Sequence, residues 1–465
     1  MLSFFKLNDP FRLLGIVFLL AILRIPYLLL EIPLLQPELI WMLIGERMSN
    51  GYSMYVDIID DTGALSAGVY WLIHLIAGKS LLAYHVVAAL IILFQASYIN
   101  HLLIQYKAFE ENTYIPALVM LVLFHLSFDF LTLSPSLMGS TFILLALGQL
   151  FSQTVRHQDQ PEPVFLVGLF GGIALCFHFP LMVFLPFFLA AGLIISGYNL
   201  HQLLLCLTGY FLPIILCALY YFWIDGFSEF ITGFVYSIRI VDVYRHVAYS
   251  DLASLLGLAL FFTFWGFVLG FLTKRLTVNQ QKQNQLIILY LVFAILPLVA
   301  ANRLTPYQLV VLLPGLTYYI SQIFIYLNRK RLTAFAFYAF LLGVPSTGYV
   351  WLSQKLSSGG IDHYAVNIDN RYDFTDNSTV LVLGQDLGYY RNASLAGPYL
   401  NYQLSKPVLA EYKNYPALTK IYLAFKNEKP EYVIDEEGTF AALLEHLPEL
   451  AAGYALEAEG VYRLK

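Results

Sequence analysis

Five carboxylate side chains lie within 24 residues, directly after the first long apolar stretch of the chain: Glu38, Glu46, Asp57, Asp60 and Asp61. A carboxylate can act as a general base on an incoming hydroxyl group, and carboxylates can also hold a divalent cation against a phosphate. Ionisable groups at a membrane surface are costly unless they have a partner or a function. A solvated acidic loop is the alternative, but the aromatic residues among these acids favour a functional site.

Basic residues near later apolar stretches offer phosphate-binding chemistry. Arg303 stands four residues before Tyr307, at the start of an apolar stretch. A guanidinium there could bind two oxygens of a phosphate in a forked geometry. Arg239 and Arg245, between two other apolar stretches, offer the same chemistry. The alternative for all three is a cation that reaches the membrane surface while its aliphatic stem stays in the apolar layer.

Two polar residues, Asp129 and His178, lie in predominantly apolar sequence. Each could line a cavity or be a hydrogen-bonded interior residue. No second His or Cys stands at metal-ligand spacing from His178, so we predict no zinc site. The chain has no Walker loop and no Gly-x-Ser-x-Gly nucleophile. The segment Gly384–Gly388 lacks the third glycine of a dinucleotide-binding loop, so we assign no cofactor to it.

The composition shows which elements must position these residues. Of 465 residues, 59% are hydrophobic and only 12% are charged, against roughly 25% charged in soluble domains. This excludes a soluble enzyme and favours a polytopic membrane protein with helical spans. Residues 353–465 carry 15 acidic and ten basic residues, so the net charge of −5 lies in the last quarter. The sequence has no stripe of basic residues that would indicate nucleic-acid binding. The three cysteines all lie in apolar stretches.

Apolar stretches near the spanning length of about 20 residues predict eleven helices. Pro180 marks either a turn or a kink between two of them. The predicted spans are 13–33, 80–105, 114–130, 136–152, 163–179, 181–197, 202–224, 251–273, 285–301, 307–328 and 333–352.

Positive charge in the short loops predicts the orientation. With the N-terminus in the cytoplasm, cytoplasmic segments hold ten Lys and Arg residues and outer loops hold five. The same count places the C-terminal part outside. We therefore expect a transmembrane domain at 1–352 and a soluble extracytoplasmic domain at 353–465.

Two long outer loops, 34–79 and 225–250, are also predicted. The first contains an amphipathic stretch and, over 64–77, an interfacial or re-entrant helix. The C-terminal domain reads as α/β, with strands at 379–384, 429–435 and 460–464 and helices at 396–404, 415–426 and 438–446.

This layout resembles the GT-C class of integral-membrane glycosyltransferases, most closely the bacterial protein mannosyltransferase and aminoarabinose transferase group. The matching residues are Glu38, the Gly51–Asp57 stretch, Tyr70 to Gly78, and Arg303 before Tyr307. The C-terminal strand patterns Leu-Val-Leu-Gly and Lys-Pro-Glu-Tyr-Val-Ile are also similar.

The resemblance implies a sugar donor linked to polyprenyl phosphate that reaches the site from the membrane, and a glycan, lipid or protein acceptor. It implies Glu38 as general base, Asp60 or Asp61 as assistant, Asp57 as a loop-positioning residue, and Arg303 as the phosphate ligand, with a divalent cation as the other source of positive charge. It also implies a bacterial inner membrane with the C-terminal domain in the periplasm.

One departure from the family keeps other functions open. Asp61-Thr62-Gly63 stands where the family has a Lys-Pro motif whose lysine would meet the lipid phosphate; His178 would be its substitute. A non-catalytic membrane subunit of an envelope assembly or export complex is therefore a second hypothesis. A transporter or lipid flippase is a third, although the chain shows no inverted repeat.

Overall fold

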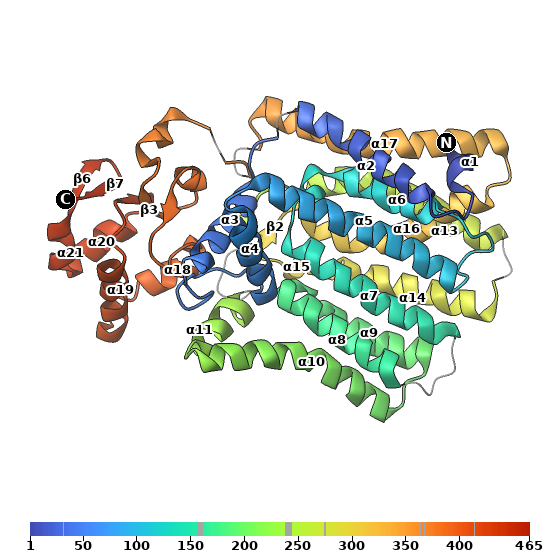
Figure 1. The fold of residues 1–465 in the computed structure, drawn as a ribbon, viewed down its shortest axis with the longest axis horizontal. Coiled ribbons are helices and arrows are strands. Elements are labelled where there is room, and N and C mark those ends of the chain that lie inside the picture. The colour runs from blue at the N-terminus through green and yellow to red at the C-terminus, as the bar shows by residue number, and fades with distance from the viewer. Residues whose placement is uncertain are drawn as a thin grey trace. The chain divides into compact units, whose positions relative to one another are not determined.

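The computed structural model describes residues 1–465 except 31, 156–160, 238–243, 274–275, 362–363, 367 and 413. The chain forms two compact units (Figure 1). The first consists of Met1–Ile32, Tyr84–Cys217 and Tyr244–Gly360, and the second of Pro33–Ala83, Ala218–Val243 and Ile361–Lys465.

Long apolar helices dominate the fold. In the described part of the chain, nine helical segments are long and apolar enough to cross a membrane. They are α2 (Arg12–Leu29), α5 (Leu81–Gln105), α7 (Pro135–Val155), the segment Phe179–Ser196 that contains α9 (Phe184–Ala191), α10 (Leu200–Trp223), α13 (Tyr249–Thr273), α14 and α15 (Val278–Ala294 and Leu296–Ala300), η6 and α16 (Pro306–Leu312 and Leu313–Tyr326), and α17 (Lys330–Ser358).

Two shorter apolar helices, α6 (Ile115–Leu123) and α8 (Pro161–Phe177), occupy the remaining predicted spans. Each of the eleven predicted spans therefore coincides with helix, and the prediction of a polytopic helical protein is confirmed. Helix α8 ends before Pro180, which opens a new 3-10 turn (η3, Phe179–Val183) because a proline fits the first turn of a helix.

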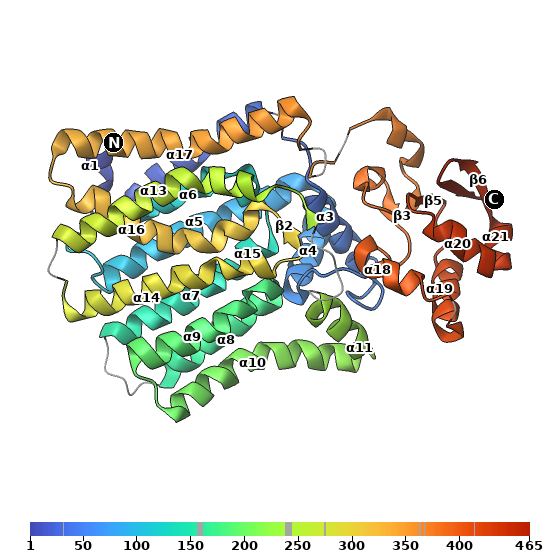
Figure 2. The ribbon, with the colours of Figure 1, turned by 180° about the vertical axis from the view of Figure 1, so that it is seen from behind.

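The first unit is a helical bundle whose centre is formed by η6 and α16. This span is 94% buried, whereas α2 is only 28% buried and presents apolar side chains outward. Helices α7, α14 and α16 run side by side in both views (Figure 2). Helix α8 approaches α10 through glycine: a Cβ on Gly168 would lie 1.9 Å from the carbonyl oxygen of Cys206, as expected where small residues let membrane helices pack closely.

The second unit contains the segment 34–79, most of the segment 225–250 and the C-terminal α/β domain. In the first loop, α3 (Gln36–Ser49) packs against α4 (Ala64–Ala77), where Trp41 stacks on Tyr70 with ring centroids 5.7 Å apart. The amphipathic stretch and the 64–77 segment are thus helices, as predicted. The middle loop forms α11 (Phe227–Phe230) and η5 (Ile231–Val235).

The C-terminal domain is built on a five-stranded sheet in the order β4-β3-β5-β7-β6. Strand β3 is parallel to β4 and β5, whereas β7 is antiparallel to β5 and β6. Strands β3 and β5 are apolar and buried over Val380–Leu383 and Tyr432–Ile434, as expected for strands buried on both faces. The elements are β3 (Thr379–Leu383), β4 (Ser394–Leu395), α18 (Tyr402–Leu409), α19 (Tyr415–Asn427), β5 (Tyr432–Asp435), α20 (Thr439–His446), α21 (Pro448–Gly453), β6 (Tyr454–Ala458) and β7 (Val461–Leu464).

The predicted helix over 396–404 is wrong over most of its length. The chain forms strand β4 and then a turn, and α18 begins only at Tyr402. Gly397 has a φ of +86° and precedes Pro398, a combination that prevents a helix there. The Asn401 side chain accepts a hydrogen bond from the Leu404 amide and so caps the helix that follows. Strand β6 was not predicted.

Candidate functional site

Glu38 lies in the first turn of α3, in the second unit. Leu35 is extended and Pro37 stands at the start of the helix, which sets where α3 begins. A Glu38 carboxylate oxygen accepts a hydrogen bond from the Leu35 amide at 3.4 Å, and the residue is 3% exposed. The positive end of the helix dipole stabilises a carboxylate at this position. The structure therefore buries this predicted base in the first turn of α3.

The loop after α3 is shaped by Tyr55. This residue adopts a left-handed conformation with φ 68°, which is uncommon for a bulky side chain. Its amide donates to the carbonyl of Ile58 at 2.9 Å, and its hydroxyl donates to the carbonyl of Thr62 at 2.6 Å. Its ring packs among rings from α10, α11 and η5, those of Tyr221, Phe230 and Phe234. Rings from residues 221–234 thus pack against the turn of the acidic loop.

The three aspartates of this loop have different environments. Asp57 is half-buried and accepts a hydrogen bond from the Ser53 amide at 2.8 Å. Asp60 is fully buried; it accepts from the amide and hydroxyl of Thr62, at 3.0 and 2.5 Å, and from the Asn401 side chain at 3.1 Å. Asp61 is half-buried. These contacts fit a loop-shaping role for Asp57 and Asp60, and Asp61 is less buried than Asp60.

Helix α3 is tied to the C-terminal domain by a forked ion pair. Arg47 donates to both carboxylate oxygens of Glu428, at 2.5 and 2.8 Å, and to the carbonyl of Leu395 at 3.2 Å. Its guanidinium also lies 3.6 Å from the centre of the Tyr52 ring. Burial opposes the charge of Glu428, but the hydrogen bonds from Arg47 and the Gly397 amide outweigh it and lower the pKa of this carboxyl below 4.5.

A second polar contact joins α3 to the same domain. Lys79 pairs with Glu46 at 3.4 Å and donates to the carbonyls of Tyr390 and Ala393, each at 3.1 Å. The Ser394 hydroxyl donates to Glu46 as well. Burial lowers the pKa of Lys79, and the Glu46 charge offsets part of this effect. Sequence analysis placed Glu46 in the acidic cluster; in the structure it is a structural ion-pair partner.

The first unit brings together four of the other predicted residues. Asp129 is fully buried and accepts a hydrogen bond from the Tyr307 amide at 2.9 Å. His178 Nε2 lies 2.7 Å from the side-chain oxygen of Gln308, whose amide nitrogen lies 3.5 Å from the Arg303 carbonyl. The contact residue Gln308 was missed by sequence analysis, although its position next to Tyr307 was a usable signal.

Arg303 begins the short strand β2 (Arg303–Leu304), which is parallel to β1 (Tyr244–Arg245). The backbone pairing therefore brings Arg245, an exposed residue, to the neighbouring register position. Arg239 lies outside the described residues. Among the described residues, no group of three or more His, Cys, Asp or Glu side chains is placed to hold a metal ion.

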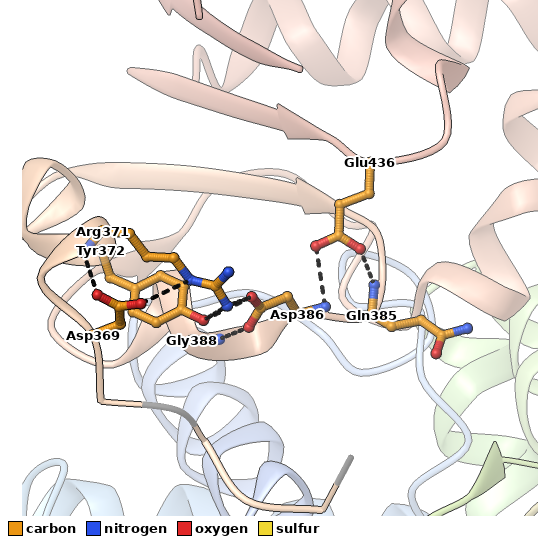
Figure 3. Close-up of polar contacts among 7 residues, drawn as sticks. All are labelled: Asp369, Arg371, Tyr372, Gln385, Asp386, Gly388 and Glu436. Atoms are coloured by element: carbon orange, nitrogen blue, oxygen red, sulfur yellow. Dashed lines mark hydrogen bonds and ion pairs between the residues drawn. The ribbon is translucent and has the colours of Figure 1, made fainter. Parts of the chain in front are cut away.

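The Gly384–Gly388 segment follows β3 and forms a separate polar cluster (Figure 3). Its Gln385 and Asp386 amides donate to the carboxylate of Glu436 at 2.8 and 3.3 Å. Asp386 in turn accepts from Arg371 and from the Tyr372 hydroxyl, both at 2.7 Å. Burial and the nearby Asp386 charge raise the pKa of Glu436, against the effect of the two amides. The two loop amides thus bind a carboxylate of the chain itself.

Comparison with known proteins gives similarity in structure but not in sequence. No protein-family model matches the chain, and no curated protein matches it. The oligosaccharyltransferase of Archaeoglobus fulgidus in its apo form has a TM-score of 0.51 at 12% identity, over 96% of this chain and 73% of that chain.

Two ligand-bound structures are similar as well. The archaeal oligosaccharyltransferase AglB from Archaeoglobus fulgidus was solved in complex with an inhibitory peptide and a dolichol-phosphate. Its TM-score is 0.51 at 11% identity, over 98% of this chain and 75% of that chain. ArnT from Cupriavidus metallidurans, bound to undecaprenyl phosphate, has a TM-score of 0.52 at 11% identity, over 93% of this chain and 94% of that chain. These similarities confirm the expected GT-C fold, in a divergent form, and with the apolar helices they identify an integral membrane protein.

Proposed function

We propose that the chain transfers a sugar from a polyprenyl-phosphate donor to an acceptor hydroxyl at the outer face of the membrane. The observation that carries this proposal is the shared fold with ArnT, which was solved with undecaprenyl phosphate and is covered over 94% of its length. AglB, solved with a dolichol-phosphate and an inhibitory peptide, has the same fold. A bacterial inner membrane, with the C-terminal domain in the periplasm, is part of the proposal.

In the proposed reaction the acceptor oxygen attacks the anomeric carbon of the sugar. The bond between this carbon and the phosphate oxygen breaks, and polyprenyl phosphate leaves with the bonding electrons. Glu38 takes the hydroxyl proton, since a carboxylate within hydrogen-bond reach can act as general base. Asp61 orients the hydroxyl, while Asp57 and Asp60 hold the loop in shape.

The leaving phosphate gains negative charge and needs positively charged or hydrogen-bonding groups. We propose Arg303 as its main ligand, because a guanidinium matches two phosphate oxygens. His178, Tyr307 and Arg245 are further proposed contacts to the donor. A divalent cation is the alternative source of positive charge.

The test is native mass spectrometry and activity of the purified protein and of Glu38→Gln, with Glu459→Gln, an exposed residue in the C-terminal domain, as the control. We expect a polyprenyl-phosphate sugar to co-purify with all three. Release of polyprenyl phosphate should fall at least a hundredfold in Glu38→Gln only, because general-base catalysis contributes about 10²- to 10⁴-fold. Normal release by Glu38→Gln would refute the assignment of the base.

A non-catalytic subunit of an envelope complex is the second candidate. The sequence Asp61-Thr62-Gly63 favours this candidate, because it lacks the lysine that the GT-C family resembled by this chain has at that place. This candidate predicts that no such lipid co-purifies, that a partner protein does, and that Glu38→Gln has no effect.

A further inference from the structure

Asn401 contacts the acidic loop from the C-terminal domain. Its side-chain amide donates to a carboxylate oxygen of Asp60 at 3.1 Å, and its side-chain oxygen accepts from the Leu404 amide at 3.4 Å. These two contacts determine the orientation of the amide, since a flipped amide would place oxygen against oxygen. Asn401 is 3% exposed and Asp60 is fully buried. One side chain therefore caps α18 and binds the acidic loop.

The backbone around Asn401 pairs with the same loop. The Asn401 amide donates to the carbonyl of Ile59 at 2.9 Å, and the Ile59 amide donates to the carbonyl of Pro398 at 2.7 Å. A buried carboxylate is costly unless donors surround it. The Thr62 donors to Asp60 come from the loop itself and would move with it. The donor from Asn401 comes from a different part of the chain and ties the loop to the domain.

The C-terminal domain also contacts the chain just before α3 and the end of α3 itself. Before α3, the Gln36 amide donates to the carbonyl of Tyr364 and the Val366 amide to that of Leu34, at 2.9 and 2.7 Å. The Arg47–Glu428 pair holds the end of α3. The chain from residue 34 to Asp60 is thus attached to the C-terminal domain at three successive places, with Asn401 at the last of them.

We propose that Asn401 is a positioning residue that holds the Asp60–Asp61 segment, so that the acidic loop keeps its shape only while the C-terminal domain is attached to it. Its importance for sugar transfer rests on the proposed function. Loss of the Asn401 donor exposes or displaces Asp60, and Asp61 moves with it because the two residues are adjacent in the chain.

The test uses Asn401→Asp in the full-length protein. Aspartate caps a helix about as well as asparagine, so α18 keeps its cap while the donor to Asp60 becomes a second carboxylate. Two carboxylates this close repel each other, and one of them takes up a proton as the pH falls. The control is Asn414→Asp, which lies at the start of α19, is exposed, and makes no side-chain capping bond.

The readout is hydrogen exchange of residues 58–62, compared with the wild type at each pH. We expect exchange at least tenfold faster in Asn401→Asp at pH 8 and close to the wild-type rate near pH 5, with Asn414→Asp unchanged at both. An equal rate in Asn401→Asp and the wild type at pH 8 would overturn the proposal. So would a loss of protection that persists near pH 5, since this would indicate misfolding and not repulsion at Asp60.

Single-turnover release of polyprenyl phosphate from the co-purified lipid is the second readout. Release should fall in Asn401→Asp at pH 8 and recover as the pH falls, opposite to the trend expected when a catalytic carboxylate becomes protonated. If the wild type releases nothing while the exchange pattern appears, the positioning role stands and the transferase proposal fails. If release is normal and exchange is unchanged in Asn401→Asp, the positioning role fails and the transferase proposal stands.

Discussion

Removing the charge of Glu428 tests how strongly the C-terminal domain holds α3. In Glu428→Gln, Arg47 keeps its contacts with the Leu395 carbonyl and the Tyr52 ring but loses its carboxylate partner. The Arg47 side chain is only 5% exposed, so water replaces little of the lost interaction; the Glu428 side chain is 21% exposed.

Breaking a fully buried pair costs about 3–5 kcal/mol, because a charge is left buried without its partner. Since Glu428 is partly exposed, we expect about 2–3 kcal/mol for Glu428→Gln. At about 1.4 kcal/mol per factor of ten, the lower value corresponds to a roughly 30-fold larger population of the detached state.

Native-state hydrogen exchange of residues 43–49 measures this population directly. The control is Glu437→Gln, which breaks the more exposed pair with Lys406, at 2.6 Å with side chains 36% and 53% exposed. Such surface pairs contribute up to about 1 kcal/mol, so exchange should change less than about fivefold. If Glu428→Gln accelerates exchange no more than Glu437→Gln does, the forked pair is not what holds α3.

Two further predictions follow from the same principles. The pKa of Glu428 is lowered in the folded protein, so its stabilising effect is fully present above about pH 4.5 and is lost as the pH falls through the lowered pKa. The protection of residues 43–49, measured as the exchange rate relative to that of an unprotected amide at the same pH, should therefore fall on acidification in the wild type and much less in Glu428→Gln. In the first unit, Gly168→Ala should destabilise the packing of α8 against α10 by about 1–3 kcal/mol, because its Cβ would meet the Cys206 carbonyl. Thermal unfolding in detergent measures this, with Gly257→Ala, whose Cβ would meet nothing within 4 Å, as the control; equal melting of the two variants would contradict it.

The membrane-spanning helices were predictable because their signal is local. A stretch of about 20 apolar residues identifies a span wherever it occurs, and each predicted span coincides with helix. The wrong prediction of a helix over 396–404 and the missed strand β6, both in the C-terminal domain, also have local causes. Gly397 and Pro398 outweighed an apparently helical composition, and β6 is exposed at four of its five positions and lacks the apolar alternation of a half-buried strand.

The roles of the acidic residues could not be separated in the same way. Asp60 and Asp61 are adjacent and chemically identical in the sequence, but one is fully buried and the other half-buried. Asp60 also accepts a hydrogen bond from Asn401, which lies 341 residues later in the chain. A hydrogen bond over this separation leaves no local pattern, and the same holds for Arg47 and Glu428.

By itself, the sequence determined that the chain spans a membrane, where its helices lie, and that five acids gather between the first two long apolar stretches. These properties depend on composition and on spacing along the chain. Only the tertiary structure decided which acids are held by the C-terminal domain and which acid lies at the start of a helix. It also decided that Glu46 and Arg47 are structural partners of that domain. Burial and hydrogen bonding are set by residues that become neighbours only on folding, because they depend on distances in space.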